Sequence, residues 1–304
     1  MSENFGLIGT ITHDVIAFES GPAIEGIGGV LYQAGVLCGL GKDVFLHSNL
    51  GQELVKDVGR IIEGWSTFHK EGIQHVRGPG NQVNLFYPQK GERVEVLKSV
   101  VPPLNPVQLL KDLPELGMLL LVMNSGFDIE LIDWQKIVQS ASCPIWLDIH
   151  SLVLDRKLGV PREYISLTEW KKWTEGVSYL QSNKQEVASM LGNPKKVISE
   201  DDIADFGKKA FDLGVKAVFI TLGKEGGIVL TPEGSKKIAS SEANTIVDTT
   251  GCGDVFCAAT AAKLVEGENP FSAASFGLKL ATRAVSLKGV EETYSMALNH
   301  ADKE

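Results

Sequence analysis

Residues 248–256 read Asp-Thr-Thr-Gly-Cys-Gly-Asp-Val-Phe and follow a short strand-like segment at 245–247. Glycines let a backbone turn tightly without interfering side chains. Successive N–H groups at a helix start form a concavity for an anion, helped by the positive end of the helix dipole. The stretch therefore predicts a phosphate-binding turn between a strand and a long helix.

Asp254 lies just inside that predicted helix. Its negative charge makes it a poor neighbour for a phosphate, but the carboxylate is well placed to accept a proton from a substrate hydroxyl. An Asp that merely caps the helix on a glycine turn explains the same residues. Taken alone, the residues leave both interpretations open.

Short apolar runs alternate with amphipathic helical stretches before this turn. The runs of strand length are 5–8, 44–47, 118–123, 145–149, 177–180 and 217–221. The helical stretches are 30–40, 53–64, 129–140, 184–191 and 201–213. This alternation predicts a three-layer α/β/α fold with a central, mostly parallel sheet and ligands at the carboxyl ends of its strands.

Two segments interrupt the alternation. Residues 15–27 and 74–101 have β-type patterning with Gly, Pro and charges but no helix of their own, which predicts hairpins that form a small β lid over a cleft. Ordinary surface excursions are the alternative. Gly and Ala dominate residues 251–262 and 273–284, which predicts two closely packed helices.

The string Asp-Thr-x-Gly-x-Gly-Asp at 248–254 resembles the C-terminal signature of the ribokinase-like, or PfkB-type, carbohydrate kinase family. The resemblance implies a single ribokinase-like kinase domain over 1–304. It implies ATP-dependent transfer of the γ-phosphoryl group to a hydroxyl of a small sugar or sugar-like substrate. In that interpretation Asp254 is the general base, and the backbone amides of Gly251, Cys252 and Gly253 neutralise charge on the transferring group.

Further matches concern the acceptor. Residues 9–14 look like the family's opening segment, which implies that Asp14 binds substrate hydroxyls. Gly28 and Gly29 resemble the paired-glycine substrate loop, although Gln33 stands where Asn is usual. Asn124, at a predicted strand end, is a candidate for shaping the same pocket.

Two other matches concern the nucleotide. Asn183 and Glu186 fit the N-x-x-E motif of the magnesium and phosphate network, with Glu186 acting on Mg²⁺ through water. An exposed helix start explains these two residues equally well. Thr221, Gly223 and Gly226 resemble the turn that approaches ATP. The resemblance thus implies ATP and Mg²⁺ as cofactors, and it also allows a monovalent cation near the anion hole.

The sequence also departs from the family pattern. Gln52 follows the 49–51 segment where Asp is usual, and the segment of Asp148 and His150 lacks the common Asp-Pro-Asn continuation. Both departures indicate a subfamily whose substrate differs from ribose. His13 and His150 are additional candidates for shaping the pocket.

The acceptor class stays open between a sugar, a nucleoside and another small alcohol. Apolar walls for a nucleoside could come from Phe18, Phe86 and Tyr87. Polar groups for a sugar could come from Asp14, Gln33, Asn84 and Asn124. We favour the sugar. A non-catalytic metabolite sensor or assembly subunit of the same fold is the alternative from another class.

Composition excludes several other classes. With 29 basic and 38 acidic residues, the net charge of -9 gives no support to a nucleic-acid or anionic-membrane partner. The longest apolar run, 116–123, is too short to span a bilayer. No basic region followed by an apolar stretch precedes residue 5, so we expect no secretory signal. The glycine cluster at 26–29 lacks the third glycine of a dinucleotide-binding turn, and no P-loop motif occurs.

Two expectations concern the environment and assembly. The four cysteines include no C-x-x-C pair, which indicates reduced thiols and a cytoplasmic location. The apolar residues of the lid could pair with a second copy to make a homodimer, as in several relatives.

Overall fold

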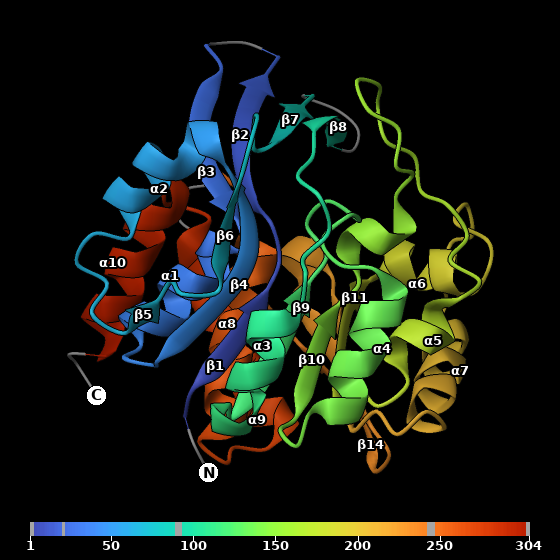
Figure 1. Cartoon of the computed structure of the whole chain (residues 1–304). Coiled ribbons are helices and arrows are strands. Elements are labelled where there is room, and N and C mark those ends of the chain that lie inside the picture. Colours follow the sequence, from blue (N-terminus) through green and yellow to red (C-terminus); the bar gives the residue numbers. More distant parts are fainter. Residues whose placement is uncertain (1–2, 20–21, 89–92, 242–246, 302–304) are drawn as a thin grey trace.

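The computed structural model describes residues 3–19, 22–88, 93–241 and 247–301, and a central sheet runs through it between two layers of helices (Figure 1). In spatial order the strands of this main sheet are β14 (Gly234–Ile238), β13 (Gly227–Thr231), β12 (Ala217–Thr221), β11 (Tyr179–Asn183), β10 (Ile145–Asp148), β9 (Met118–Val122), β1 (Phe5–Ile8), β4 (Val44–Gly51) and β5 (Phe68–His69), with β6 (Ile73–Val76) also paired to β4. Strands β12 to β5 pair in parallel, whereas β13 at the edge pairs antiparallel with both β12 and β14.

The helices divide into two layers that bury opposite faces of this sheet. One layer holds α1 (Leu31–Gly39), α2 (Val55–Ile61), α8 (Cys252–Val265), α9 (Pro270–Ala284) and α10 (Gly289–Ala301). The other holds α3 (Val107–Asp112), α4 (Leu131–Ser140), α5 (Trp170–Thr174), α6 (Lys184–Met190) and α7 (Glu200–Phe211). Short 3₁₀ turns are η1 (Gln52–Leu54), η2 (Leu113–Glu115), η3 (His150–Val153) and η4 (Gly223–Glu225).

Strand β10 shows why the central strands read as continuous apolar runs. Trp146 stacks on Phe219 in the core beneath α8, with the ring centroids 4.7 Å apart. Its neighbours Ile145 and Leu147 point into the core of the other helix layer. Side chains alternate between the two faces of a strand, and here both faces are covered by helices. Each position is therefore apolar, as the sequence pattern indicated.

A second, separate sheet lies over the carboxyl-terminal edge of the main sheet (Figure 1). Its strands, in order, are β3 (Ile24–Gly29), β2 (Ile11–Phe18), β7 (Asn81–Tyr87) and β8 (Val94–Ser99). We call this sheet the lid. Ile16, Val83, Leu85 and Leu97 form its own small apolar core. The three-layer fold and the separate β lid are confirmed.

Two predicted segments differ from the structure. Residues 74–76 belong to β6, which pairs with β4 of the main sheet, so the second lid segment starts later than 74. The expected strand 177–180 is displaced to Tyr179–Asn183, because the Val177 N–H donates to the Thr174 carbonyl and closes the turn after α5. The sequence of an extended segment does not reveal which strand it will pair with, because that pairing is decided by the tertiary structure.

Of the expected strand 245–247, residues 245 and 246 lie outside the described residues. Val247 is described, and its N–H donates to the Val285 carbonyl at 2.7 Å. This bond joins the approach to the glycine turn to the end of α9.

Helices α8 and α9 pack closely, as the small residues predicted. A Cβ atom at Gly277 of α9 would overlap Thr260 Oγ1 of α8 and lie 2.8 Å from the Phe256 carbonyl. Thr260 is fully buried. Only glycine fits this crossing, and the close contact fixes α8 within its layer.

We expect Gly277→Ala to lower the free energy of unfolding by about 1–3 kcal/mol, because the added methyl group overpacks the α8–α9 contact. The matched control is Gly59→Ala in α2, where a Cβ atom meets nothing within 4 Å. That variant should gain up to about 1 kcal/mol, because alanine favours the helix. Urea unfolding followed by tryptophan fluorescence measures both. Equal effects of the two substitutions would contradict the packing argument.

Candidate active site

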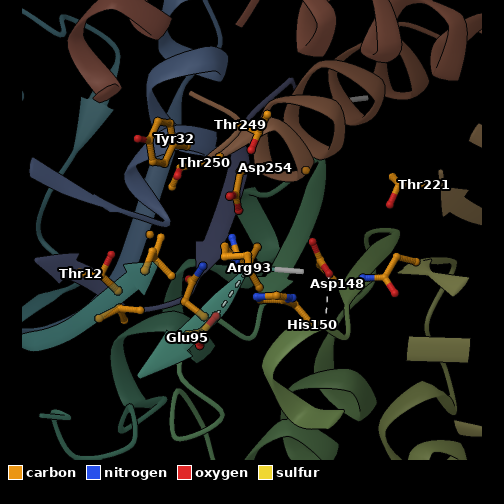
Figure 2. A pocket seen from close by; sticks show the side chains of 18 of the residues that line it. Thr12, Tyr32, Arg93, Glu95, Asp148, His150, Thr221, Thr249, Thr250 and Asp254 are labelled. Atoms are coloured by element: carbon orange, nitrogen blue, oxygen red, sulfur yellow. Dashed lines mark hydrogen bonds and ion pairs between the residues drawn. The ribbon is translucent and has the colours of Figure 1, made fainter. Parts of the chain in front are cut away.

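A cavity of about 230 Å³ lies between the lid and the carboxyl ends of the main-sheet strands (Figure 2). Its walls come from three places: the lid, the ends of β9 to β12, and the start of α8. The residues that line it include Asp14, Tyr32, Arg93, Glu95, Asn124, Asp148, His150, Gln181, Asn183, Glu186, Thr221, Gly251, Gly253 and Asp254.

The glycine turn before α8 builds one wall. Gly251 caps the helix with a φ of +78°, a conformation that L side chains rarely adopt, and a Cβ atom there would lie 2.6 Å from the Tyr32 ring. The Asp248 carboxylate accepts the Thr250 N–H at 2.8 Å, and the Val255 N–H donates to the Gly251 carbonyl at 2.8 Å. These contacts shape the turn, and the Cys252 N–H donates to the Thr249 carbonyl at 3.4 Å. The N–H groups that follow it in the first turn of α8 have no acceptor within the helix.

Gly253 differs from Gly251 in its steric surroundings. The nearest atom to a Cβ built on Gly253 is Gln181 Nε2 at 3.7 Å, an ordinary van der Waals distance, and its φ is not positive. The fold therefore does not require glycine at 253. A bare backbone at this point of the cavity wall instead gives a ligand close access to the helix amides.

Asp254 points into the cavity from the first turn of α8 (Figure 2). Burial raises the pKa of Asp254 to about 7, the positive charge of His150 opposes the rise, and the negative charge of Asp14 adds to it. The carboxyl group is thus poised to change protonation near neutral pH, as a general base requires.

Asp14 enters the cavity from lid strand β2 and is buried. Gly28 lies on the neighbouring strand β3, opposite Thr12, and a Cβ atom there would overlap Asp14 Oδ2, so glycine at 28 makes room for the carboxylate. Burial raises the pKa of Asp14 to about 6, although a hydrogen bond from Thr12 opposes the rise. Two carboxyl groups with raised pKa values therefore face one cavity, Asp14 from the lid and Asp254 from α8.

The ends of β10 and β11 add a third buried carboxyl group. Burial, with Glu186 next in importance, raises the pKa of Asp148 well above its usual range. Gln181 Nε2 donates to Asp148 Oδ2 at 2.9 Å and to the Gly253 carbonyl at 3.2 Å. Gln181 therefore links the sheet edge to the glycine turn.

Asn183 and Glu186 form a capping box at the start of α6. Glu186 is buried, not part of an exposed helix start, and its Oε1 lies 3.1 Å from His150 Nδ1. Burial alone lowers the pKa of His150, but the hydrogen bond and charge of Glu186 outweigh it and raise the pKa to about 9. His150 is therefore an imidazolium at neutral pH.

Asp128 holds the loops after β1 and β9 in place. Its Oδ1 accepts the backbone N–H and the hydroxyl of Thr10 at 3.0 and 2.8 Å, and its Oδ2 accepts the N–H groups of Ser125 and Gly126 at 3.0 and 2.9 Å. The neighbouring Asn124 Oδ1 is buried and has no hydrogen-bond partner among the described residues. An unsatisfied acceptor at a cavity wall suits a ligand hydroxyl.

Most of the predicted site residues converge on this cavity. They are Asp14, Gly29, Asn124, Asn183, Glu186, Thr221, Gly251, Gly253 and Asp254. The histidine candidates separate, since His150 lines the cavity whereas His13 lies on the outer side of β2, with its Nε2 3.3 Å from a Glu25 carboxylate oxygen.

Other predicted residues lie elsewhere. Gln33 is fully buried in α1 and is not among the lining residues. Cys252 lines a neighbouring apolar pocket. Gly226 has a φ of +96°, and a Cβ atom there would overlap the Ile238 carbonyl, so the β-hairpin itself requires this glycine. Gly223 borders the two clefts described next.

The cavity continues into two further hollows. A cleft of about 420 Å³ shares Arg93, His150, Asn183 and Thr221 with it, and also includes Lys184. A pocket of about 510 Å³ adjoins that cleft at Gly223 and the first cavity at Thr249. Its apolar walls are Leu278, Ala281 and Val285. Together the three hollows form a continuous path from the lid to an apolar end pocket.

Sequence reasoning missed several lining residues: Tyr32, Arg93, Glu95 and Gln181. Arg93 and Glu95 flank Val94 in an alternating charged and apolar segment, a pattern typical of a strand with a solvated face. No local signal shows that Glu95 is buried or that Arg93 faces Asp254.

The carboxylates offer a fit for magnesium. Asp148 and Glu186 would offer it carboxylate oxygens, the ligand type that Mg²⁺ prefers, and Mg²⁺ commonly keeps several waters beside one or two carboxylates. Among the described residues no group of three His, Cys, Asp or Glu side chains is arranged to enclose an ion. A hydrated ion that is shared with phosphate oxygens agrees with both observations.

Comparisons of the sequence agree on one family. The profile described as pfkB family carbohydrate kinase matches residues 159–296. A ribokinase of Arabidopsis thaliana is 30% identical over 156 residues, which cover 51% of this chain and 37% of that protein. The matched part therefore spans little more than a third of the length of this curated relative.

Comparisons of the structure cover nearly the whole chain. The structure of Arabidopsis thaliana ribokinase complexed with ribose and ATP superposes with a TM-score of 0.76 at 19% identity, over 99% of each chain. A nucleoside kinase of Burkholderia thailandensis in complex with inosine gives 0.74 at 17% identity, over 98% of each chain. These likenesses show that the fold is ribokinase-like. In the described part of the chain, no helix has the length and apolarity needed to cross a bilayer.

The raised pKa of Asp254 generates a prediction about stability. A neutral carboxyl group favours the folded state, so its contribution is full below the unfolded pKa, near 4, and is lost as pH rises through about 7. Asp254→Asn carries no such group. The variant should gain stability relative to the wild type by up to about 1.4 kcal/mol per pH unit between pH 4 and 7, and the difference should then level off.

Urea unfolding of both proteins at pH 4.5, 6, 7 and 8 measures this difference. Asp14 titrates in both proteins, so its contribution cancels to first order in the difference between their free energies of unfolding. A difference that stays constant over this pH range would show that Asp254 titrates normally in the folded state.

Proposed function

The chain belongs to the ribokinase-like pfkB family of carbohydrate kinases, and from this premise we propose that it is an ATP-dependent kinase that phosphorylates a hydroxyl of a small sugar or sugar-like acceptor. The observation that carries the proposal is the position of Asp254. Its carboxyl group lines the cavity, and the residue belongs to the first turn of α8, directly after the glycine turn.

The size and polarity of the cavity support a sugar over a nucleoside. A volume of about 230 Å³ is below the usual range for drug-sized ligands, and Asp14, Asn124 and the glycine turn supply polar groups. The three aromatic residues that the sequence offered for a nucleoside are not among the lining residues: the rings of Phe18 and Tyr87 stack with centroids 5.7 Å apart, and Phe86 is exposed. Tyr32 is the aromatic side chain that lines the cavity. Gln33 and Asn84 are likewise not among the lining residues.

The connected clefts support ATP as the donor. The adenine base suits the apolar end pocket of Leu278, Ala281 and Val285, and the phosphates would then pass Gly223 and Thr221 towards Gly253. Lys184 lies along this path. Mg²⁺ bound through water near Glu186 and Asp148 would neutralise charge on the phosphates.

In the proposed reaction Asp254 takes the proton of the acceptor hydroxyl. The acceptor oxygen forms a bond to the γ-phosphorus while the bond from that phosphorus to the β–γ bridging oxygen breaks, and ADP leaves with the electron pair. The amides at Gly251 to Asp254 would stabilise charge on the transferring group. Because the transition state is loose, most acceleration comes from alignment, charge neutralisation and exclusion of water under the lid.

A side-chain contact joins the lid to the glycine turn. The Tyr87 hydroxyl lies 3.0 Å from Thr250 Oγ1, which connects β7 to the turn that carries Asp254. This contact supports a closed arrangement that excludes water as the catalytically competent one.

The cysteines Cys38, Cys143, Cys252 and Cys257 are free thiols, which supports a reducing, cytoplasmic location.

Asp254→Asn tests the general base. We expect turnover to fall by roughly two to four orders of magnitude while both ligands still bind, because the isosteric amide cannot accept the proton. The measurement is ADP release with Mg-ATP over a panel of sugars, nucleosides and related alcohols, with ligand binding followed by calorimetry.

The panel also separates the alternatives. Turnover with sugars that vanishes in Asp254→Asn supports the proposal, and turnover with nucleosides alone would replace the acceptor class. Saturable binding without turnover across the panel would favour a sensor or assembly subunit. Wild-type turnover in the variant would remove Asp254 from the mechanism.

Gly253→Ala tests the anion-binding turn separately from the fold. Because a Cβ atom at 253 meets its nearest neighbour at 3.7 Å, the variant should unfold at the same urea concentration as the wild type. We expect its kcat to fall by about 10²-fold, as for the loss of one oxyanion contact, because the methyl group holds the phosphate away from the amides.

Gly251→Ala serves as the contrasting variant. It should lose stability as well as activity, because of its positive φ and the contact with Tyr32. If Gly253→Ala kept full kcat at saturating ATP and acceptor, the phosphate would have to bind elsewhere.

A further inference from the structure

The cavity poses an electrostatic problem for a phosphoryl donor. Five carboxyl groups line it: Asp14, Glu95, Asp148, Glu186 and Asp254. The γ-phosphoryl group of ATP must nevertheless approach Asp254 to reach the acceptor. Hydrated magnesium near Glu186 would offset part of this repulsion, and the remainder calls for a cation on the lid side of the transferring group.

Two cationic side chains are among the described lining residues, Arg93 and His150. His150 already pairs with Glu186, its Nδ1 lying 3.1 Å from Oε1. A third cation nearby, Arg162, has a fully buried side chain whose N–H groups are bound to Glu95 and to the Asp155 and Ser125 carbonyls. Arg93 is the cation best placed to meet a ligand.

Arg93 stands immediately before lid strand β8, and its side chain is 33% exposed. It lines both the acceptor cavity and the cleft that continues towards Gly223, so it lies where a phosphate would pass from one to the other. Figure 2 shows its side chain in the middle of the cavity, between Glu95 and the group formed by Asp148, His150 and Asp254.

The guanidinium group is held in this position by a chain of charges that begins in the body of the protein. Arg162 Nη1 donates to Glu95 Oε1 at 2.8 Å, and Arg93 Nη2 lies 3.3 Å from Glu95 Oε2. The Arg162 N–H also donates to the Glu95 carbonyl at 2.8 Å, and the Gly159 N–H to the Leu97 carbonyl at 2.8 Å. Strand β8 is thereby joined to residues 159–162. Glu95 is held in place on this strand, and its ion pair with Arg93 orients the guanidinium group.

We propose that Arg93 is a further catalytic residue, which contacts the transferring phosphoryl group from the lid side and neutralises its charge opposite the amides of the glycine turn. The guanidinium fork suits two phosphate oxygens at once, and a donor fixed in place before the reaction stabilises the transition state most strongly. Glu95 is a positioning residue for it. This inference rests on the proposed kinase function and adds a residue to its machinery.

The test uses Arg93→Ala and Arg93→Lys, with Arg156→Ala as a control. Arg156 lies over the Phe127 ring at 4.9 Å and is not among the residues of either hollow, so its loss removes the same charge elsewhere. Arg93→Ala leaves the buried Glu95–Arg162 pair intact, and because Arg93 is partly exposed the variant should fold. Kinetics use saturating Mg-ATP with the acceptor found in the panel. Calorimetry measures ADP and a non-hydrolysable ATP analogue.

We expect Arg93→Ala to lower kcat by about 10²-fold or more. Its affinity for the ATP analogue should fall by about tenfold or more, because a charge-assisted hydrogen bond to the γ-phosphate is lost, while its ADP affinity changes less than about twofold. The kcat and the analogue affinity of Arg93→Lys should lie between those of the wild type and Arg93→Ala, since lysine keeps the positive charge but lacks the paired N–H donors of the guanidinium group. Added guanidinium should partly restore kcat in Arg93→Ala.

Three results would overturn the inference: unchanged kcat, equal losses for ADP and the analogue, or an effect confined to the KM of the acceptor. The binding comparison separates this inference from the kinase proposal. If the wild type turned over no acceptor, the analogue-to-ADP affinity ratio would still show whether Arg93 reads the γ-phosphate. If Arg93→Ala kept the kcat of the wild type, the kinase would stand and this inference would fail.

Discussion

The structure depends on a buried helix that carries a carboxyl group at its end. From Val255 to Ala262 every residue of α8 is buried, because the helix lies between the main sheet, α1 and α9. A helix that is apolar all round has no face to move towards solvent. The glycine turn and Asp254 are therefore fixed relative to the strand ends, which is the precision that in-line chemistry needs.

The raised pKa values of the site follow from the burial of its carboxyl groups. Asp14, Asp148 and Asp254 come from different elements, and burial is the largest cause of the shift in each case. Each ionised form costs stability that a neutral side chain would not cost. Functional sites commonly retain such groups at the expense of stability, because the chemistry needs a base whose pKa is near the working pH.

The lid is connected to the body by charge as well as by backbone pairing. A buried ion pair such as Glu95–Arg162 contributes little net stability, since desolvation offsets most of the attraction, but breaking it leaves an unpaired buried charge. The pair therefore favours one docking position of β8 over others. Together with the Tyr87–Thr250 contact, it defines the roof of the cavity from two strands of the lid.

The sequence alone determined the layers of the fold and the position of the glycine turn, because apolar periodicity and glycine conformation are local properties. It also indicated Asp14, Asp254 and the Asn183–Glu186 helix start through their motifs. Only the tertiary structure decided that Gln33 is buried within α1, that Glu186 binds His150, and that Arg93 faces Asp254. Burial, ion pairing and the approach of distant segments depend on which strands and loops meet, and no local pattern encodes that choice.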